Sequence, residues 1–71
     1  MSIENAAKRL TEILNASVPP NMRSMVIRTE HDENGNQIKT ILVSARSPYQ
    51  NKLRPPSEID GFPVRVVPWE D

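Results

Sequence analysis

The sequence predicts an α+β domain in which one amphipathic N-terminal helix packs on a three-stranded sheet. Three observations predict it: apolar residues at helical spacing near the N-terminus, two β-prone runs on either side of Asn34-Gly35, and a third such run at Val64–Val67. A chain of 71 residues has room for a single small domain. We therefore expect residues 1–71 to fold as one α+β unit.

The helix is expected at residues 3–15, where apolar side chains recur at intervals of three and four residues. They are Ile3, Ala6, Ala7, Leu10, Ile13 and Leu14. Ser2 is a suitable N-cap, and Glu4 lies in the first turn, where the helix dipole favours an acid. Asn15 is expected to end the helix in a left-handed conformation. A helix of this length is marginal alone, so its apolar stripe must pack on the rest of the chain.

A β-hairpin is expected at residues 24–45, because Asn34-Gly35 is the residue pair most typical of a two-residue type I′ turn. That turn fixes a register whose opposed pairs are Val26 and Val43, Ile27 and Leu42, Thr29 and Thr40, and Glu30 and Lys39. Aliphatic side chains, threonines and opposite charges are all matched, which favours this register over its alternatives.

The same register predicts which face of the hairpin the helix covers. One face carries no permanently charged side chain and consists of Met25, Ile27, Thr29 and His31 opposite Ile38, Thr40, Leu42 and Ser44. We expect this uncharged face to lie under the helix. The main core is then expected to consist of Leu10, Ile13, Ile27 and Leu42.

Residues 46–71 are expected to supply a proline-rich connection and the third strand. Ser47-Pro48 has the form of an N-cap followed by proline at the first helical position, which predicts a short helix at 48–53. Prolines on both sides of Val64–Val67 suit a short edge strand. The long connection allows that strand to run parallel to the second one.

The segment at residues 56–66 reads PSEIDGFPVRV and contains an expected turn at Asp60-Gly61. Its form, P-x-x-I-D-G-x-P-V-x-V, follows a helix, two strands and a proline-rich connection. This order of elements resembles the small N-terminal module that precedes trypsin-like domains in some bacterial proteins. The first strand departs from the module, because residues 24–27 read SMVI where a glycine-rich run is expected. The resemblance implies a stand-alone bacterial version of that module, to which no catalytic residue can be transferred.

The residue composition supports no catalytic chemistry. The chain has no cysteine, which excludes disulfides and thiolate metal sites. His31 is the only histidine, and no second ligand or catalytic partner stands at a recognisable spacing from it. Turns explain Gly35 and Gly61 better than a phosphate-binding loop does. We therefore expect no catalytic residue, no cofactor and no metal site, and a protein that is not an enzyme.

The basic side chains are concentrated in the middle of the chain, although nine basic and nine acidic residues cancel overall. Residues 39–54 contain Lys39, Arg46, Lys52 and Arg54 and no acidic side chain. Tyr49 lies among these cations, in a pattern that can bind phosphates and stack a base, and that equally suits a solvated connection. Overall neutrality argues against strong nonspecific binding of nucleic acid.

Trp69 is the second notable feature, because a large indole near a chain end is expected to pack back on the sheet or to contact a partner. The candidate interaction surface consists of Arg46, Tyr49, Lys52, Arg54 and Trp69. We expect a non-enzymatic protein-interaction or assembly module, with a protein partner or a homodimer formed through an exposed sheet edge. The alternative is a small nucleic-acid-binding protein that uses the basic segment 39–54. No apolar stretch is long enough to span a bilayer and no signal-peptide pattern is present, so we expect a cytoplasmic protein without membrane association.

Overall fold

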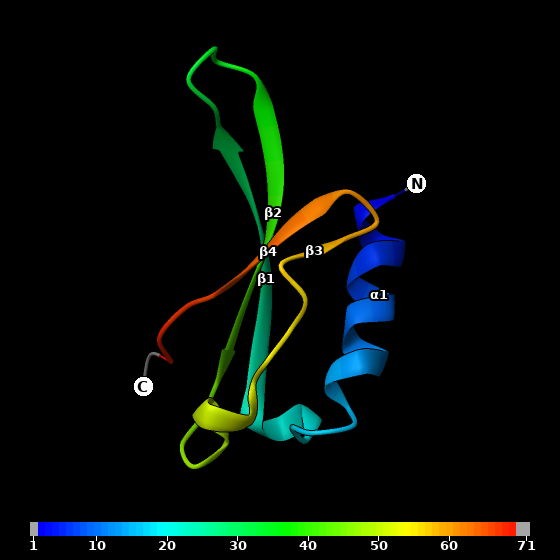
Figure 1. The fold of residues 1–71 in the computed structure, drawn as a ribbon, viewed down its shortest axis with the longest axis vertical. Helices are drawn as coiled ribbons and strands as arrows, with labels where there is room; N and C mark the ends of the chain where they lie inside the picture. Colours follow the sequence, from blue (N-terminus) through cyan, green and yellow to red (C-terminus); the bar gives the residue numbers. More distant parts are fainter. Residues whose placement is uncertain (1, 70–71) are drawn as a thin grey trace.

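The structure, a computed structural model, describes residues 2–69 and confirms the α+β architecture. One helix, α1 (Ile3–Leu14), lies along one face of a four-stranded mixed sheet (Figure 1). The strands are β1 (Arg23–His31), β2 (Gln37–Ala45), β3 (Glu58–Ile59) and β4 (Phe62–Val66), and short 3-10 helices occupy Pro20–Met22 and Tyr49–Lys52. The strand order is β1-β2-β4-β3, so β1 and β3 form the two edges. As predicted, the strand that follows the crossover runs parallel to β2.

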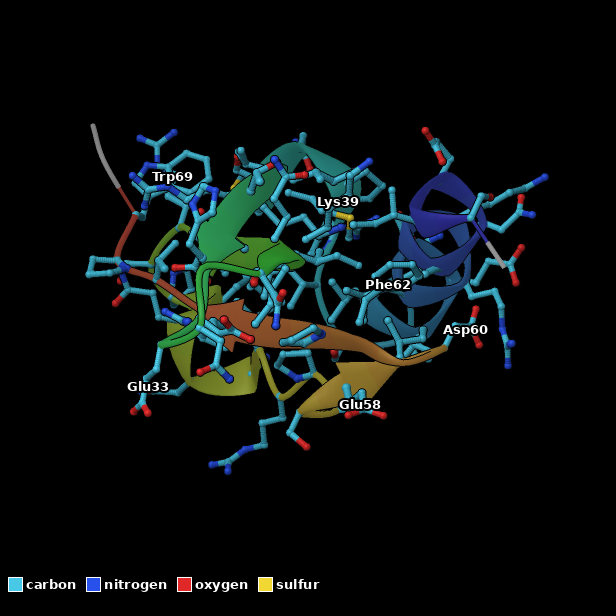
Figure 2. The ribbon with its side chains drawn as sticks, turned by 90° about the horizontal axis from the view of Figure 1, so that it is seen from above. Glu33, Lys39, Glu58, Asp60, Phe62 and Trp69 are labelled. Atoms are coloured by element: carbon cyan, nitrogen blue, oxygen red, sulfur yellow. The ribbon has the colours of Figure 1, made fainter. Side chains whose placement is uncertain are left out.

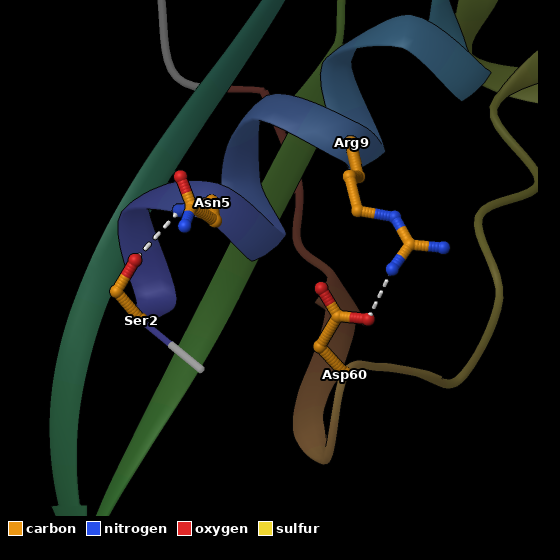
Figure 3. A network of polar contacts seen from close by, with 4 residues as sticks. All are labelled: Ser2, Asn5, Arg9 and Asp60. Carbon is orange, nitrogen blue, oxygen red and sulfur yellow. Dashed lines mark hydrogen bonds and ion pairs between the residues drawn. The ribbon is translucent and has the colours of Figure 1, made fainter.

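The N-terminus of α1 is capped as the sequence predicts, since the Asn5 backbone N–H donates a hydrogen bond of 3.2 Å to Ser2 Oγ (Figure 3). The C-terminus differs from the prediction. Asn15 is the C-cap but has φ −59°, a right-handed conformation, so no left-handed residue ends the helix. The chain instead continues into a turn in which the Val18 N–H donates to the Leu14 carbonyl at 2.9 Å. This turn brings Val18 into the core.

The predicted hairpin exists, but the predicted register is wrong by one residue. Val26 lies opposite Leu42 and Ile27 opposite Ile41. The loop has three residues rather than two: the Gly35 N–H donates to the Asp32 carbonyl, and the Asp32 N–H donates to the Asn36 carbonyl, both at 3.0 Å. Gly35 has φ +81°, whereas a type I′ turn would also require positive φ at Asn34.

The Asp32 side chain explains this turn. Asp32 Oδ1 accepts hydrogen bonds of 2.9 Å from the backbone N–H groups of both Asn34 and Asn36, and Oδ2 accepts one of 3.3 Å from the Asn36 side-chain amide. These bonds stabilise a turn that begins at Asp32, with Gly35 supplying the left-handed residue that a three-residue loop needs. The preference of Asp32 for its own backbone therefore overrides the Asn-Gly signal.

The shift of one residue reverses the orientation of every β2 side chain. The β2 side chains that face α1 are Ile41, Val43 and Ala45, all at most 2% exposed, instead of the expected Ile38, Thr40, Leu42 and Ser44. On β1 the prediction holds for Met25, whose sulfur lies 4.0 Å from Thr11 Oγ1 of α1. Ile27 is 43% exposed and Ile13 is 48% exposed, so neither belongs to the core; of the four predicted core residues only Leu10 is fully buried.

The C-terminal part contains a strand that was not predicted. β3 pairs antiparallel with the start of β4, with Ile59 opposite Phe62, so β4 is covered on its outer side where an edge strand was expected. The connecting residues Asp60 and Gly61 have φ of 51° and 87°, the positive values of a two-residue hairpin turn. The type I′ geometry expected at Asn34-Gly35 therefore occurs here instead.

The core lies between α1 and the covered face of the sheet. Its buried residues are Ile3, Ala6, Leu10, Leu14, Val18, Ile41, Val43, Ala45, Leu53, Ile59 and Val64. Leu53 follows the short 3-10 helix at Tyr49–Lys52, which corresponds to the helix expected at 48–53. Pro48 rather than Ser47 is its N-cap, and no side chain caps it. An ion pair of 2.6 Å between Arg9 and Asp60 joins α1 to the β3–β4 turn (Figure 3).

Candidate functional site

The outer edge of β1 is the longest unpaired strand edge of the described chain. β1 has nine residues and pairs with β2 over its whole length without a bulge. A backbone hydrogen bond lies at each end of this pairing: the Arg46 N–H donates to the Met22 carbonyl, and the Asp32 N–H donates to the Asn36 carbonyl. On the β1 side, both bonds are made by even-numbered residues. Because successive residues of a strand direct their backbone groups to opposite sides, the odd-numbered residues point theirs outward. The free N–H and C=O groups therefore belong to Arg23, Met25, Ile27, Thr29 and His31.

The opposite edge of the sheet is protected in ways that β1 is not. Its outermost strand, β3, has only two residues, and β4 contains Pro63 and is followed by Pro68. Short strands and prolines are the usual means by which proteins prevent edge-to-edge association. β1 contains no proline and exposes two neighbouring aliphatic side chains, Val26 at 54% and Ile27 at 43%. The sheet therefore has one blocked edge and one open edge.

The sheet face away from α1 has a polar end and an apolar end. Toward the hairpin tip, Glu30 Oε1 accepts hydrogen bonds from Thr40 Oγ1 at 2.9 Å and from Arg65 at 2.8 Å. These contacts join β1, β2 and β4 and leave Thr40 only 1% exposed. The predicted pairing of Glu30 with Lys39 is thus replaced by an ion pair with Arg65. This polar cluster ends the apolar part of the face.

The apolar end of this face forms a groove beside the β1 edge. The groove has a volume of about 760 Å³ and is lined by Ser24, Val26, Ile27, Arg28, Leu42, Ser44, Val67, Pro68 and Trp69. Figure 2 shows Trp69 on the side of the sheet away from α1, whereas Phe62 lies on the α1 side. Trp69 is half-buried and also lines a smaller hollow of about 310 Å³ with Leu53 and Val66. Trp69 therefore packs back on the sheet and forms a wall of the groove at the same time.

The basic segment does not form one surface. Lys39 and Arg46 lie at opposite ends of β2, about 23 Å apart at the usual rise of a strand. Arg46, Lys52 and Arg54 are exposed near the 3-10 helix at Tyr49–Lys52. Tyr49 packs against the core, and Lys52 Nζ lies 5.6 Å from the centre of its ring. Lys52 thus lies over the ring that the nucleic-acid alternative would use to stack a base.

The described residues contain no cluster of side chains that could hold a metal ion. No group of three or more metal-ligating side chains occurs within residues 2–69, and every buried side-chain nitrogen and oxygen there has a hydrogen-bond partner. His31 is exposed at the end of β1. No helix in the described part of the chain is both long enough and apolar enough to cross a bilayer.

Comparison of the chain with protein-family models, curated proteins and solved structures found no match. The resemblance to the module that precedes trypsin-like domains therefore stays a prediction.

Sequence reasoning found one part of this site and missed the rest. Trp69 was predicted as an interaction residue because of its type and position, and it lines the groove. Val26 and Leu42 were missed, because the assumed register placed them on opposite faces of the hairpin. The aspartate before the turn was the signal that would have corrected the register, through its known preference for bonding the backbone two residues ahead.

Proposed function

We propose that the chain is a non-enzymatic protein-interaction module that binds a partner strand at the open edge of β1. The free edge is the observation behind the proposal: along the nine-residue strand β1, the odd-numbered residues present outward N–H and C=O groups beside an apolar groove. Strand addition of this kind takes its affinity from backbone hydrogen bonds and its specificity from pockets for alternate side chains. The groove beside Val26 and Trp69 is placed to receive such side chains.

The accessible surface area supports a module that buries further surface when it binds a partner. The accessible surface is 5070 Å², whereas a compact monomer of 8.1 kDa is expected to expose about 4,500 Å². Part of the surplus comes from the hairpin, whose tip projects beyond α1 and β4 (Figure 1). Val26 and Ile27 lie in the middle of the exposed strand, where a partner would remove them from water.

The test is affinity purification of the tagged chain from its native cell, comparing wild type with Val26→Lys and Ile13→Lys. The two positions are similarly exposed, at 54% and 48%, but Ile13 lies on the helix, away from the edge. We expect Val26→Lys to lose the proteins that copurify with wild type and Ile13→Lys to retain them. Identical sets of proteins from both variants would contradict a role for the edge.

The nucleic-acid alternative predicts a different result from the same preparations. It requires retention on RNA or DNA that falls steeply with added salt and is lost when Lys52 and Arg54 are both replaced by alanine. We expect no such retention, because Lys39 lies far from the other basic side chains of the segment and Tyr49 contacts Lys52. Salt-dependent retention that requires Lys52 and Arg54 would favour the alternative over the proposed function.

A further inference from the structure

We infer that the strand bound at the β1 edge is β1 of a second copy of this chain, paired antiparallel about a two-fold axis at Val26. The inference rests on the proposed function and names its partner. It is drawn from the pattern of free backbone groups along β1 and from the side chains that each register would bring together.

The backbone permits only certain registers. The even-numbered residues Met22 and Asp32 form backbone hydrogen bonds toward the β2 side, so the outward N–H and C=O groups belong to odd-numbered residues. Two such edges form hydrogen bonds only if odd-numbered residues face odd-numbered residues. A symmetric antiparallel pair must therefore be centred on one residue that faces its own copy, and the central positions of β1 offer Val26, Ile27 and Arg28.

The side chains select among these three centres. A centre at Arg28 would place two guanidinium groups directly opposite each other, which is unfavourable. A centre at Ile27 would place the aliphatic Val26 opposite the charged Arg28, so that Val26 would have no apolar side chain opposite it. A centre at Val26 places Val26 against its copy and Ile27 opposite the half-buried Met25, so that each exposed aliphatic side chain faces an apolar one. In this register Arg28 lies opposite the small polar Ser24, and no like charges are opposed.

The same register joins the two grooves. Val26 lines each groove and lies next to the axis, so the grooves of the two copies meet there. The two four-stranded sheets then form one continuous sheet. Both copies of α1 lie on one side of it, and both copies of Trp69 lie on the other side. Val26 and Ile27, now 54% and 43% exposed, become interface residues.

The absence of cysteine from the sequence allows a direct test with single-cysteine variants of the full chain: Val26→Cys, Arg28→Cys and Val66→Cys. Val26 would face its copy at a position without direct backbone hydrogen bonds, where the two Cα atoms are about 4.5 Å apart and a disulfide can form. Two copies of residue 28 would be about 14 Å apart, beyond the reach of a disulfide. Val66, 54% exposed like Val26, is the control for random collisions.

We expect Val26→Cys to form covalent dimers at least tenfold faster than either other variant under mild oxidation. Wild type should approach twice 8.1 kDa in sedimentation equilibrium as its concentration rises, and Val26→Lys, checked for a native circular dichroism spectrum, should not. Equal cross-linking rates for the three variants would overturn the inference. So would a wild-type mass of 8.1 kDa up to millimolar concentration. If the chain is monomeric while Val26→Lys still abolishes capture of a different protein, the second copy is wrong and the proposed function stands.

Discussion

Leu10 contributes the most completely buried large side chain of α1, with 0% exposure in the centre of the core. Replacement by alanine removes apolar contacts and leaves a cavity between the helix and the sheet. We expect Leu10→Ala to lower the free energy of unfolding by about 2–5 kcal/mol, a large share of the stability of a small domain. Urea denaturation measures this loss. Ile13→Ala is the control, and because Ile13 is 48% exposed it should cost less than about 1 kcal/mol. Equal losses for both variants would contradict the observed orientation of α1.

Asp32 determines the hairpin turn and should make that turn sensitive to pH. The hydrogen bond from the Asn36 backbone N–H, with those from the Asn34 N–H and the Asn36 side chain, lowers the pKa of Asp32 below its ordinary value of 3.8. A carboxyl group with a lowered folded-state pKa stabilises the fold above its unfolded-state pKa. That contribution is lost as the pH falls through the folded-state value.

We therefore expect Asp32→Asn to be less stable than wild type at neutral pH, because the amide lacks the charge that strengthens these bonds. The difference between the two proteins should shrink as the pH falls below 3.8. Urea denaturation of both proteins between pH 7 and pH 2 measures it. A difference that stays constant over this range would show that the ionised carboxylate does not stabilise the turn.

At the scale of whole elements, β4 connects parts of the chain that are distant in sequence. It pairs with β2 in parallel and with β3 in antiparallel orientation, and Val64 is buried in the core. We expect a fragment of residues 1–61 to remain unfolded, because a hairpin and one helix bury too little surface to be stable in water. Amide spectra of the fragment check this, with full-length protein as the control. Well-dispersed amide signals from the fragment would contradict the requirement for β4.

The sequence predicts those elements that depend on neighbouring residues, and it fails where two local preferences compete. The start of α1 at Ile3 follows from its capping residue Ser2, and the parallel orientation of β4 follows from the length of the crossover. The β1–β2 register does not follow from Asn34-Gly35, because Asp32 bonds the same backbone and starts the turn earlier. β3 was missed because two residues carry no periodic pattern, although Asp60-Gly61 is itself a hairpin signal.

The candidate site was harder to predict than the fold for the same reason. Whether Leu42 belongs to the core or to the groove depends wholly on the register, since one residue of shift exchanges the two faces of β2. An exposed sheet edge was expected, but which strand forms it depends on the strand order. The strand expected at Val64–Val67, with prolines on both sides, was expected to form an edge. In the structure β3 covers β4, and the long open edge belongs to β1.

At the scale of the whole molecule, the two edges of the sheet behave differently. The β3 edge is short and is followed by proline-containing β4, whereas the β1 edge is long, regular and partly aliphatic. An exposed edge of this kind is a site for strand addition in proteins that use it and a cause of aggregation in those that do not. We propose that this chain uses its β1 edge for association.

Hydrogen exchange of individual β1 amides as a function of protein concentration tests this claim most directly. The N–H groups of Val26 and Arg28 point toward β2, whereas those of Met25, Ile27 and Thr29 point outward, so one strand contains both the probes and their controls. We predict that the outward amides exchange rapidly in dilute solution and become protected as the concentration rises, while Val26 and Arg28 are protected throughout. Outward amides that exchange equally fast at micromolar and millimolar concentration would contradict pairing of β1 with a second copy.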